Sequence, residues 1–144
     1  MKMNEPVASN EAEMEWAFPT VDPGNVPLGG RILVQLRRTK KKTTSAGIIL
    51  VEETRETEKW NAQVAKVIKL GPLAFRNRET MEPWPEGVWV KEGDFIRAPR
   101  WGGDRWEIPI PGEPDEDPAL FMIINDHESI SLVTGDPLSF KAFV

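Results

Sequence analysis

The chain's single histidine, His127, lies within a group of residues that carry much of the chemistry available to proteins. Its polar neighbours are Asp126, Glu128, Ser129 and Ser131. A metal site needs several ligands that converge in space, whereas adjacent residues at a strand end point in different directions. A serine nucleophile needs a base and a sharp presenting turn, and no such elbow motif surrounds these serines. The pattern therefore predicts a capped turn ahead of a strand at 130–133, and neither a metal site nor a catalytic site.

Other catalytic groups are scarce. The chain has no cysteine, which removes disulfides, thiolate nucleophiles and thiolate zinc sites and favours an intracellular compartment. Gly102-Gly103 lacks the Lys-Ser/Thr pair and the following helix of a phosphate-binding loop. The carboxylates gather in charged loops, where a solvated surface accounts for them. We therefore expect no enzyme activity, no catalytic residue, no bound metal and no cofactor.

A further candidate chemistry is the binding of single-stranded nucleic acid, which combines a basic groove with stacked aromatic rings. The basic run covers 37–42, and the tryptophans that could supply the stacking are Trp60, Trp101 and Trp106. Four glutamates follow the basic run at positions 52, 53, 56 and 58, and the whole chain carries a formal charge of −5. Because affinity for nucleic acid comes mainly from neutralising phosphates, a solvated loop is the stronger interpretation of this run.

The elements that must position any site are short. The 144 residues suit one compact domain, and a hydrophobic fraction of 40% is enough for a core. Thirteen prolines and eleven glycines indicate many turns and few long helices. No stretch is long and apolar enough to span a membrane, and the first residues lack the apolar centre of a signal peptide. We expect a cytoplasmic domain that is mostly β.

Short β-branched and apolar runs, bounded by Gly, Pro and Asp, recur along the chain. They cover 31–37, 62–69, 88–91, 95–98, 106–110, 120–124 and 130–133. Strands at this spacing predict an all-β fold, either a small barrel or a sandwich. Residues 1–26 are acidic and without periodicity, which predicts a partly disordered extension with Trp16 and Phe18 as its candidate anchors. Irregular segments are expected at 72–87 and 111–119.

One apolar run lacks an obvious place in this scheme. Ile48, Ile49, Leu50 and Val51 stand alone among the polar residues of 40–60. An edge strand between loops would explain them. The flanking sequences KKKTTSAG and EETRETEK are compatible with disorder, however, and Gly47 provides a hinge directly before the run. These features favour a flexible arm with an apolar anchor.

Several segments, taken in order and at their spacing, resemble the co-chaperonins of the GroES type. They are Pro27–Val34, Gly47–Leu50, Ala62–Ile68 followed by Gly71, Val90–Asp94, Trp101–Gly103 and Phe121–Val133. The resemblance spans about 27–134 and implies a small GroES-like β-barrel whose mobile loop covers 38–60. It implies a homoheptamer that caps a GroEL-type chaperonin ring and assists ATP-dependent protein folding. ATP would be bound and hydrolysed by the partner.

By this resemblance the chaperonin-binding residues are Ile48, Ile49 and Leu50, and Gly47 gives the backbone its freedom. The extension 1–26, the segment 72–87 and the tail 135–144 exceed the compact family pattern. These additions are similar to those of bacteriophage-encoded co-chaperonins that help to fold a large capsid protein, which predicts a location in the bacterial host cytoplasm. Two alternatives remain: a virion structural or decoration protein built on the same fold, and a single-strand nucleic-acid-binding barrel.

Overall fold

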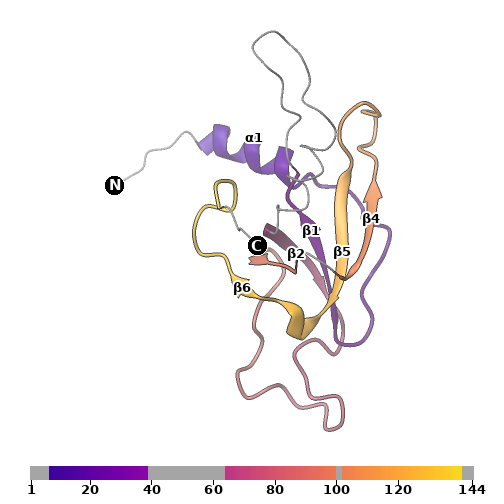
Figure 1. Cartoon of the computed structure of the whole chain (residues 1–144), viewed down its shortest axis with the longest axis vertical. Coiled ribbons are helices and arrows are strands. Elements are labelled where there is room, and N and C mark those ends of the chain that lie inside the picture. The colour runs from indigo at the N-terminus through magenta and orange to yellow at the C-terminus, as the bar shows by residue number, and fades with distance from the viewer. Residues whose placement is uncertain (1–6, 39–63, 100–101, 141–144) are drawn as a thin grey trace.

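The chain folds around a six-stranded antiparallel sheet with the strand order β4-β5-β1-β2-β3-β6 (Figure 1). This computed structural model describes residues 7–38, 64–99 and 102–140. The helices and strands are α1 (Val7–Ala17), β1 (Arg31–Leu36), β2 (Val64–Leu70), β3 (Phe95–Arg97), β4 (Asp104–Ile108), β5 (Ala119–Asn125), the 3-10 helix η1 (Asp126–Glu128) and β6 (Ser131–Leu132). The predicted all-β fold class is confirmed, with α1 as a short helical addition.

Strand β1 lies at the centre of the sheet between β5 and β2, and both of its faces are covered. Ile32, Val34 and Leu36 alternate along one face and point into the main core. That core also contains buried residues of β2, β3 and β5, together with Phe75 and Val90 from the connection between β2 and β3. A strand with two buried faces appears in the sequence as a nearly continuous apolar run, as 31–36 does.

The segment that follows α1 covers the other face of the sheet. Leu33 is buried there with Ala119 and Phe121 of β5. The side-chain amide of Gln35 donates a 2.8 Å hydrogen bond to the carbonyl oxygen of Pro19. The indole N–H of Trp106 donates a bond of the same length to the carbonyl of Pro23. These two bonds hold the N-terminal segment across the sheet.

Two features differ from the sequence-based expectation. Residues 88–91 were predicted as a strand and form none. Val88 is exposed, whereas the other two apolar side chains fill the core from a loop: Val90 is buried and Trp89 packs against Phe75 and Trp84. Helix α1 was not predicted, because the apolar residues of 7–17 show no helical periodicity. Its C-terminal end is held by packing, since Ala17 is buried beside Phe18.

At the amino end of β1, polypeptide backbones approach one another closely. The N–H of Gly71 donates to the carbonyl of Arg31 at 2.8 Å, and the N–H of Leu73 donates to that of Gly29 at 2.9 Å. A β-carbon at residue 71 would lie 2.4 Å from the carbonyl oxygen of Gly29, which is closer than two such atoms can approach. Glycine is therefore required at 71.

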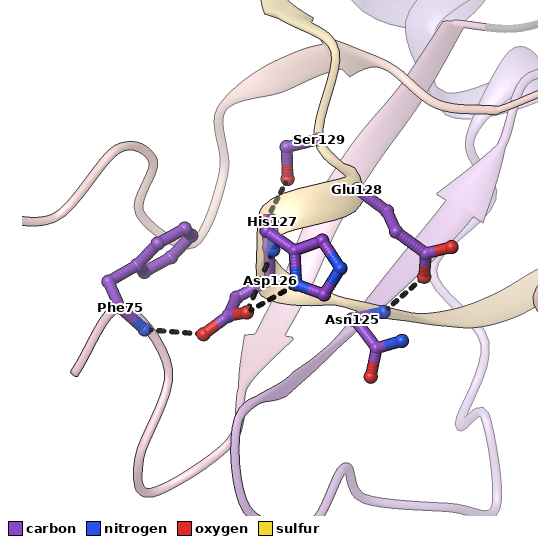
Figure 2. Close-up of polar contacts among 6 residues, drawn as sticks. All are labelled: Phe75, Asn125, Asp126, His127, Glu128 and Ser129. Atoms are coloured by element: carbon purple, nitrogen blue, oxygen red, sulfur yellow. Dashed lines mark hydrogen bonds and ion pairs between the residues drawn. The ribbon is translucent and has the colours of Figure 1, made fainter. Parts of the chain in front are cut away.

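The buried carboxylate of Asp126 completes this end of the sheet (Figure 2). Oδ2 accepts a 2.9 Å hydrogen bond from the N–H of Phe75, and Oδ1 accepts a 2.8 Å bond from the N–H of His127. Phe75 has a φ of 62°, a left-handed conformation that is uncommon for a bulky residue. Asp126 thus fixes a strained loop residue whose aromatic ring lies in the main core.

The region around His127 is the turn that the sequence predicted. Residues Asp126–Glu128 form η1, and the N–H of Asn125 donates a 2.7 Å bond to the carboxylate of Glu128 (Figure 2). Within 7–38, 64–99 and 102–140, no three His, Cys, Asp or Glu side chains form a group that could hold a metal ion. No helix found in these ranges is both long and apolar enough to cross a bilayer.

Candidate functional site

The predicted chaperonin-binding residues Gly47, Ile48, Ile49 and Leu50 lie outside the described residues, so their role stays a prediction. The structure describes the two points between which they run, Arg38 and Val64. The N–H of Arg37 donates a 3.0 Å bond to the carbonyl of Val64, which extends the β1–β2 pairing by one step. Both ends of 39–63 are therefore fixed side by side, at the carboxyl end of β1.

Arg38 is buried, and among the described residues its contacts come from the N-terminal region and the segment before β5. Its backbone N–H donates to the carbonyl of Ala17 at 2.9 Å, and Nε donates to the carbonyl of Trp16 at 2.8 Å. Nη1 donates to the carbonyl of Asp117. The guanidinium carbon lies 4.2 Å from the centre of the Trp16 ring, in cation–π geometry. Arg38 thereby links the end of α1 to the end of β1.

Burial lowers the pKa of Arg38 from its ordinary value, since desolvation disfavours the charged form. The carboxylates of Glu116, Asp117, Glu113 and Glu15 act in the opposite direction. A guanidinium stays charged in proteins, so these neighbours and the carbonyl acceptors compensate a buried positive charge.

Arg37 makes the equivalent connection to the C-terminal region. Its Nη1 donates to the carbonyls of Pro137 and Phe140, at 2.6 and 2.8 Å. Burial lowers the pKa of Arg37 as well, and the charge of Asp136 opposes that effect. The two adjacent arginines thus reach in different directions, one to each end of the described chain.

An apolar cluster lies beneath the two arginines. Ala17, Phe18 and Val64 are buried in it, and the residues packed around them are Met14, Trp16, Phe95, Leu138 and Phe140. The rings of Phe18 and Phe95 meet edge to face, with 5.2 Å between their centres. Both anchors expected in the N-terminal region, Trp16 and Phe18, lie here. We refer to this cluster together with Arg37 and Arg38 as the basal cluster.

Sequence analysis interpreted 37–42 as a solvated basic run, and for Arg38 that interpretation is wrong, because Arg38 is only 6% exposed. Net charge could not reveal this. A usable signal was available, since Arg37 and Arg38 directly continue the apolar strand 31–36. Successive side chains of a strand point to opposite faces, so two consecutive polar residues there reach different parts of the fold.

Comparison with known proteins identifies the family. Residues 25–116 match the chaperonin 10 kDa subunit family. The chain belongs to that family. It is also 25% identical to a co-chaperonin GroES of Aquifex aeolicus (strain VF5) over 107 residues, which cover 74% of this chain and 75% of that protein. The resemblance to the GroES-type co-chaperonins is confirmed. Because this family consists of co-chaperonins and not of enzymes, the chain is a co-chaperonin-type protein without catalytic activity of its own.

Proposed function

We propose that this protein caps a GroEL-type chaperonin ring as a homoheptamer and docks through the aliphatic triplet Ile48, Ile49 and Leu50. Gly47 supplies the backbone freedom that docking requires. The family match carries this proposal, because its range, 25–116, includes β1, the segment 39–63 and β2. The binding and hydrolysis of ATP belong to the ring, and both partners act in the cytoplasm.

The expected binding free energy of the triplet is small enough for the cap to be released from the ring after it has bound. Burial of three aliphatic side chains gains roughly 1.5–3 kcal/mol each, or about 5–9 kcal/mol in total. The ordering of a segment on binding costs about 2–5 kcal/mol. A single copy therefore binds weakly. Several copies on one assembly bind tightly through effective concentration and still release when the ring changes shape.

The decisive experiment is nucleotide-dependent co-sedimentation with a purified chaperonin ring, in ATP and in ADP. We expect the wild-type chain to sediment with the ring and Ile49→Asp to remain in the supernatant, since an uncompensated charge in an apolar groove costs several kcal/mol. Thr44→Asp is the matched control, because it adds the same charge to the same segment outside the triplet. Equal binding of wild type and Ile49→Asp would contradict the docking role.

The two alternative functions predict different results in this ring-binding assay and in an oligonucleotide-binding assay. A decoration protein would ignore every ring, including that of its natural host. A single-strand nucleic-acid binder would show salt-dependent binding to oligonucleotides that collapses when Lys40, Lys41 and Lys42 are neutralised. Native mass measurement of the free protein tests the heptamer.

We further propose that the protein is phage-encoded and serves the folding of a large capsid protein. The supporting feature is the amount of chain beyond the compact family pattern, namely the extension 1–26, the segment 72–87 and the tail 135–144. The folding chamber should then be larger under this cap than under the host's own cap. Equal chamber volumes in the two complexes would count against this origin.

A further inference from the structure

Two short parts of the chain that lie outside the family match meet beside Arg38 and Val64, the described residues on either side of 39–63. The family match covers 25–116, whereas the basal cluster draws Met14 to Phe18 from before it and Leu138 and Phe140 from after it. These two groups are far apart in sequence and meet around Val64. Figure 1 shows α1 beside the carboxyl end of β1, at the end of the sheet opposite the 71–90 connection.

The contacts of Arg38 in the basal cluster are directional hydrogen bonds, which the packing of a core does not require. Arg38 alone makes a backbone bond to Ala17, a bond to the Trp16 carbonyl, a bond to the Asp117 carbonyl and a stacking contact with the Trp16 ring. A planar guanidinium with fixed donors defines direction as well as distance, which an apolar side chain of similar volume does not. The last described residue before 39–63 is therefore fixed in both position and orientation.

We propose that Arg38, held by α1 and Asp117, is a positioning residue that sets where the docking segment leaves the sheet. This inference rests on the proposed function, since it concerns how the segment containing Ile48–Leu50 is presented to the ring. A tethered segment loses conformational freedom when it docks, and a fixed attachment point reduces that loss. It also raises the concentration of the segment around its binding groove. The N-terminal helix thus contributes to partner affinity without touching the partner.

Three variants test this role through their affinity for the ring in the presence of nucleotide. Arg38→Ala removes the side-chain contacts that fix the attachment point. The docking segment then loses more conformational freedom when it binds, and we expect its affinity for the ring to fall about tenfold. Insertion of Gly-Ser-Gly-Ser directly after Arg38 separates the segment from its anchored end and should weaken binding to a similar extent. Combination of the two changes should weaken binding no further than the insertion alone, because the insertion has already uncoupled the segment from Arg38.

Arg105→Ala is the matched control for the loss of a structural arginine. Arg105 also donates to backbone carbonyls, those of Gly102 and Pro99 at 3.2 and 3.1 Å, and burial lowers its pKa too. It lies on β4, outside the basal cluster. We expect Arg105→Ala to lower the unfolding midpoint and to leave ring affinity unchanged. If Arg38→Ala fails to fold, Arg38→Lys replaces it and should give an intermediate loss of affinity, because it keeps the charge and loses the stacked, forked geometry.

Wild-type affinity of Arg38→Ala, or losses that add fully in the combined variant, would overturn the positioning role and leave the proposed function intact. A wild-type chain that binds no ring would overturn both. The two failures are thus distinguishable in one set of measurements.

Discussion

The two ends of strand β1 are secured by opposite means. At the amino end, backbones meet directly, because Gly71 lies against the carbonyls of Gly29 and Arg31 and the short side chain of Asp126 bonds neighbouring N–H groups. At the carboxyl end, the long side chains of Arg37 and Arg38 reach outward to the two termini of the described chain. At the amino end there is no room for a β-carbon at residue 71. At the carboxyl end the arginine side chains extend far enough to bind segments that lie outside the family match.

This contrast separates the part of the molecule that must stay constant from the part that can vary. Close backbone packing tolerates almost no added atom, so the amino end behaves as a fixed frame. At the carboxyl end Arg38 itself is fixed, but the two arginine side chains bond to backbone carbonyls, so the residues that supply these carbonyls can change in type. The segment proposed to dock onto the ring leaves from the adaptable end.

The largest effect is expected when the fixed frame is broken. Gly71→Ala places a β-carbon 2.4 Å from the carbonyl oxygen of Gly29 and 2.6 Å from that of Arg31. Both neighbours are backbone atoms, so we expect a loss of about 3 kcal/mol or more in the free energy of unfolding. Urea denaturation of the purified protein measures it. Gly135→Ala is the control, since a β-carbon there meets open space; similar losses in both variants would mean that crowding at 71 is not the cause.

The next effect concerns the buried carboxylate at the same end. Asp126→Ala leaves the N–H groups of Phe75 and His127 without their acceptor, and Phe75 is fully buried. An unsatisfied buried donor costs about 1–3 kcal/mol, so we expect a loss of about 2 kcal/mol, read from the shift in the thermal unfolding midpoint. Asp126→Asn keeps one carbonyl oxygen and should lose less. A larger loss in the Asn variant would contradict the assignment of Asp126 as an acceptor.

The smallest effect is expected at the adaptable end. Arg37→Ala removes the two bonds to the carbonyls of Pro137 and Phe140. We expect a stability loss of about 1 kcal/mol, because these bonds hold a terminal segment and not the main core. Hydrogen exchange should become faster across 136–140 and remain unchanged in β1 and β5. Exposed Arg31, at the other end of the same strand, is the matched control, and Arg31→Ala should change stability by no more than about 0.5 kcal/mol. A loss from Arg37→Ala as large as that from Asp126→Ala would remove the contrast between the two ends.

The same contrast explains which features were predictable from sequence. The strands of the central sheet follow from local patterns of apolar and β-branched residues, and each of them overlaps a predicted run, although β4 (Asp104–Ile108) begins and ends earlier than the expected 106–110. The apolar run 88–91 has the same composition and forms no strand, because Trp89 and Val90 satisfy their burial by filling the core from a loop. An apolar composition favours burial but does not determine the backbone conformation, and Val88 of the same run is exposed.

The candidate site divides in the same way. The aliphatic triplet at 48–50 could be recognised from its isolation in a polar segment and from its resemblance to the family motif, and its role remains a prediction. The continuation of the apolar strand into Arg37 and Arg38 was a signal for burial, but the partners of Arg38 could not be recognised, because Trp16, Ala17 and Asp117 are distant in sequence. Helix α1 was missed for the same reason: its stability comes from contacts of its C-terminal end and not from a periodic apolar face.

The contribution of Leu138 and Phe140 to the basal cluster also has a consequence for biosynthesis. A chain grows from its N-terminus, so α1, β1 and β2 leave the ribosome well before residues 138 and 140 exist. The β1–β2 pairing joins nearby parts of the chain, whereas the contact of Phe18 and Val64 with the C-terminal residues closes across most of its length. Completion of the basal cluster therefore follows the synthesis of residues 138 and 140. Until that moment a nascent chain lacks the contacts of Leu138 and Phe140 with this cluster and the bonds of Arg37 to 137 and 140, so a chain that stops before them would anchor its docking segment less firmly.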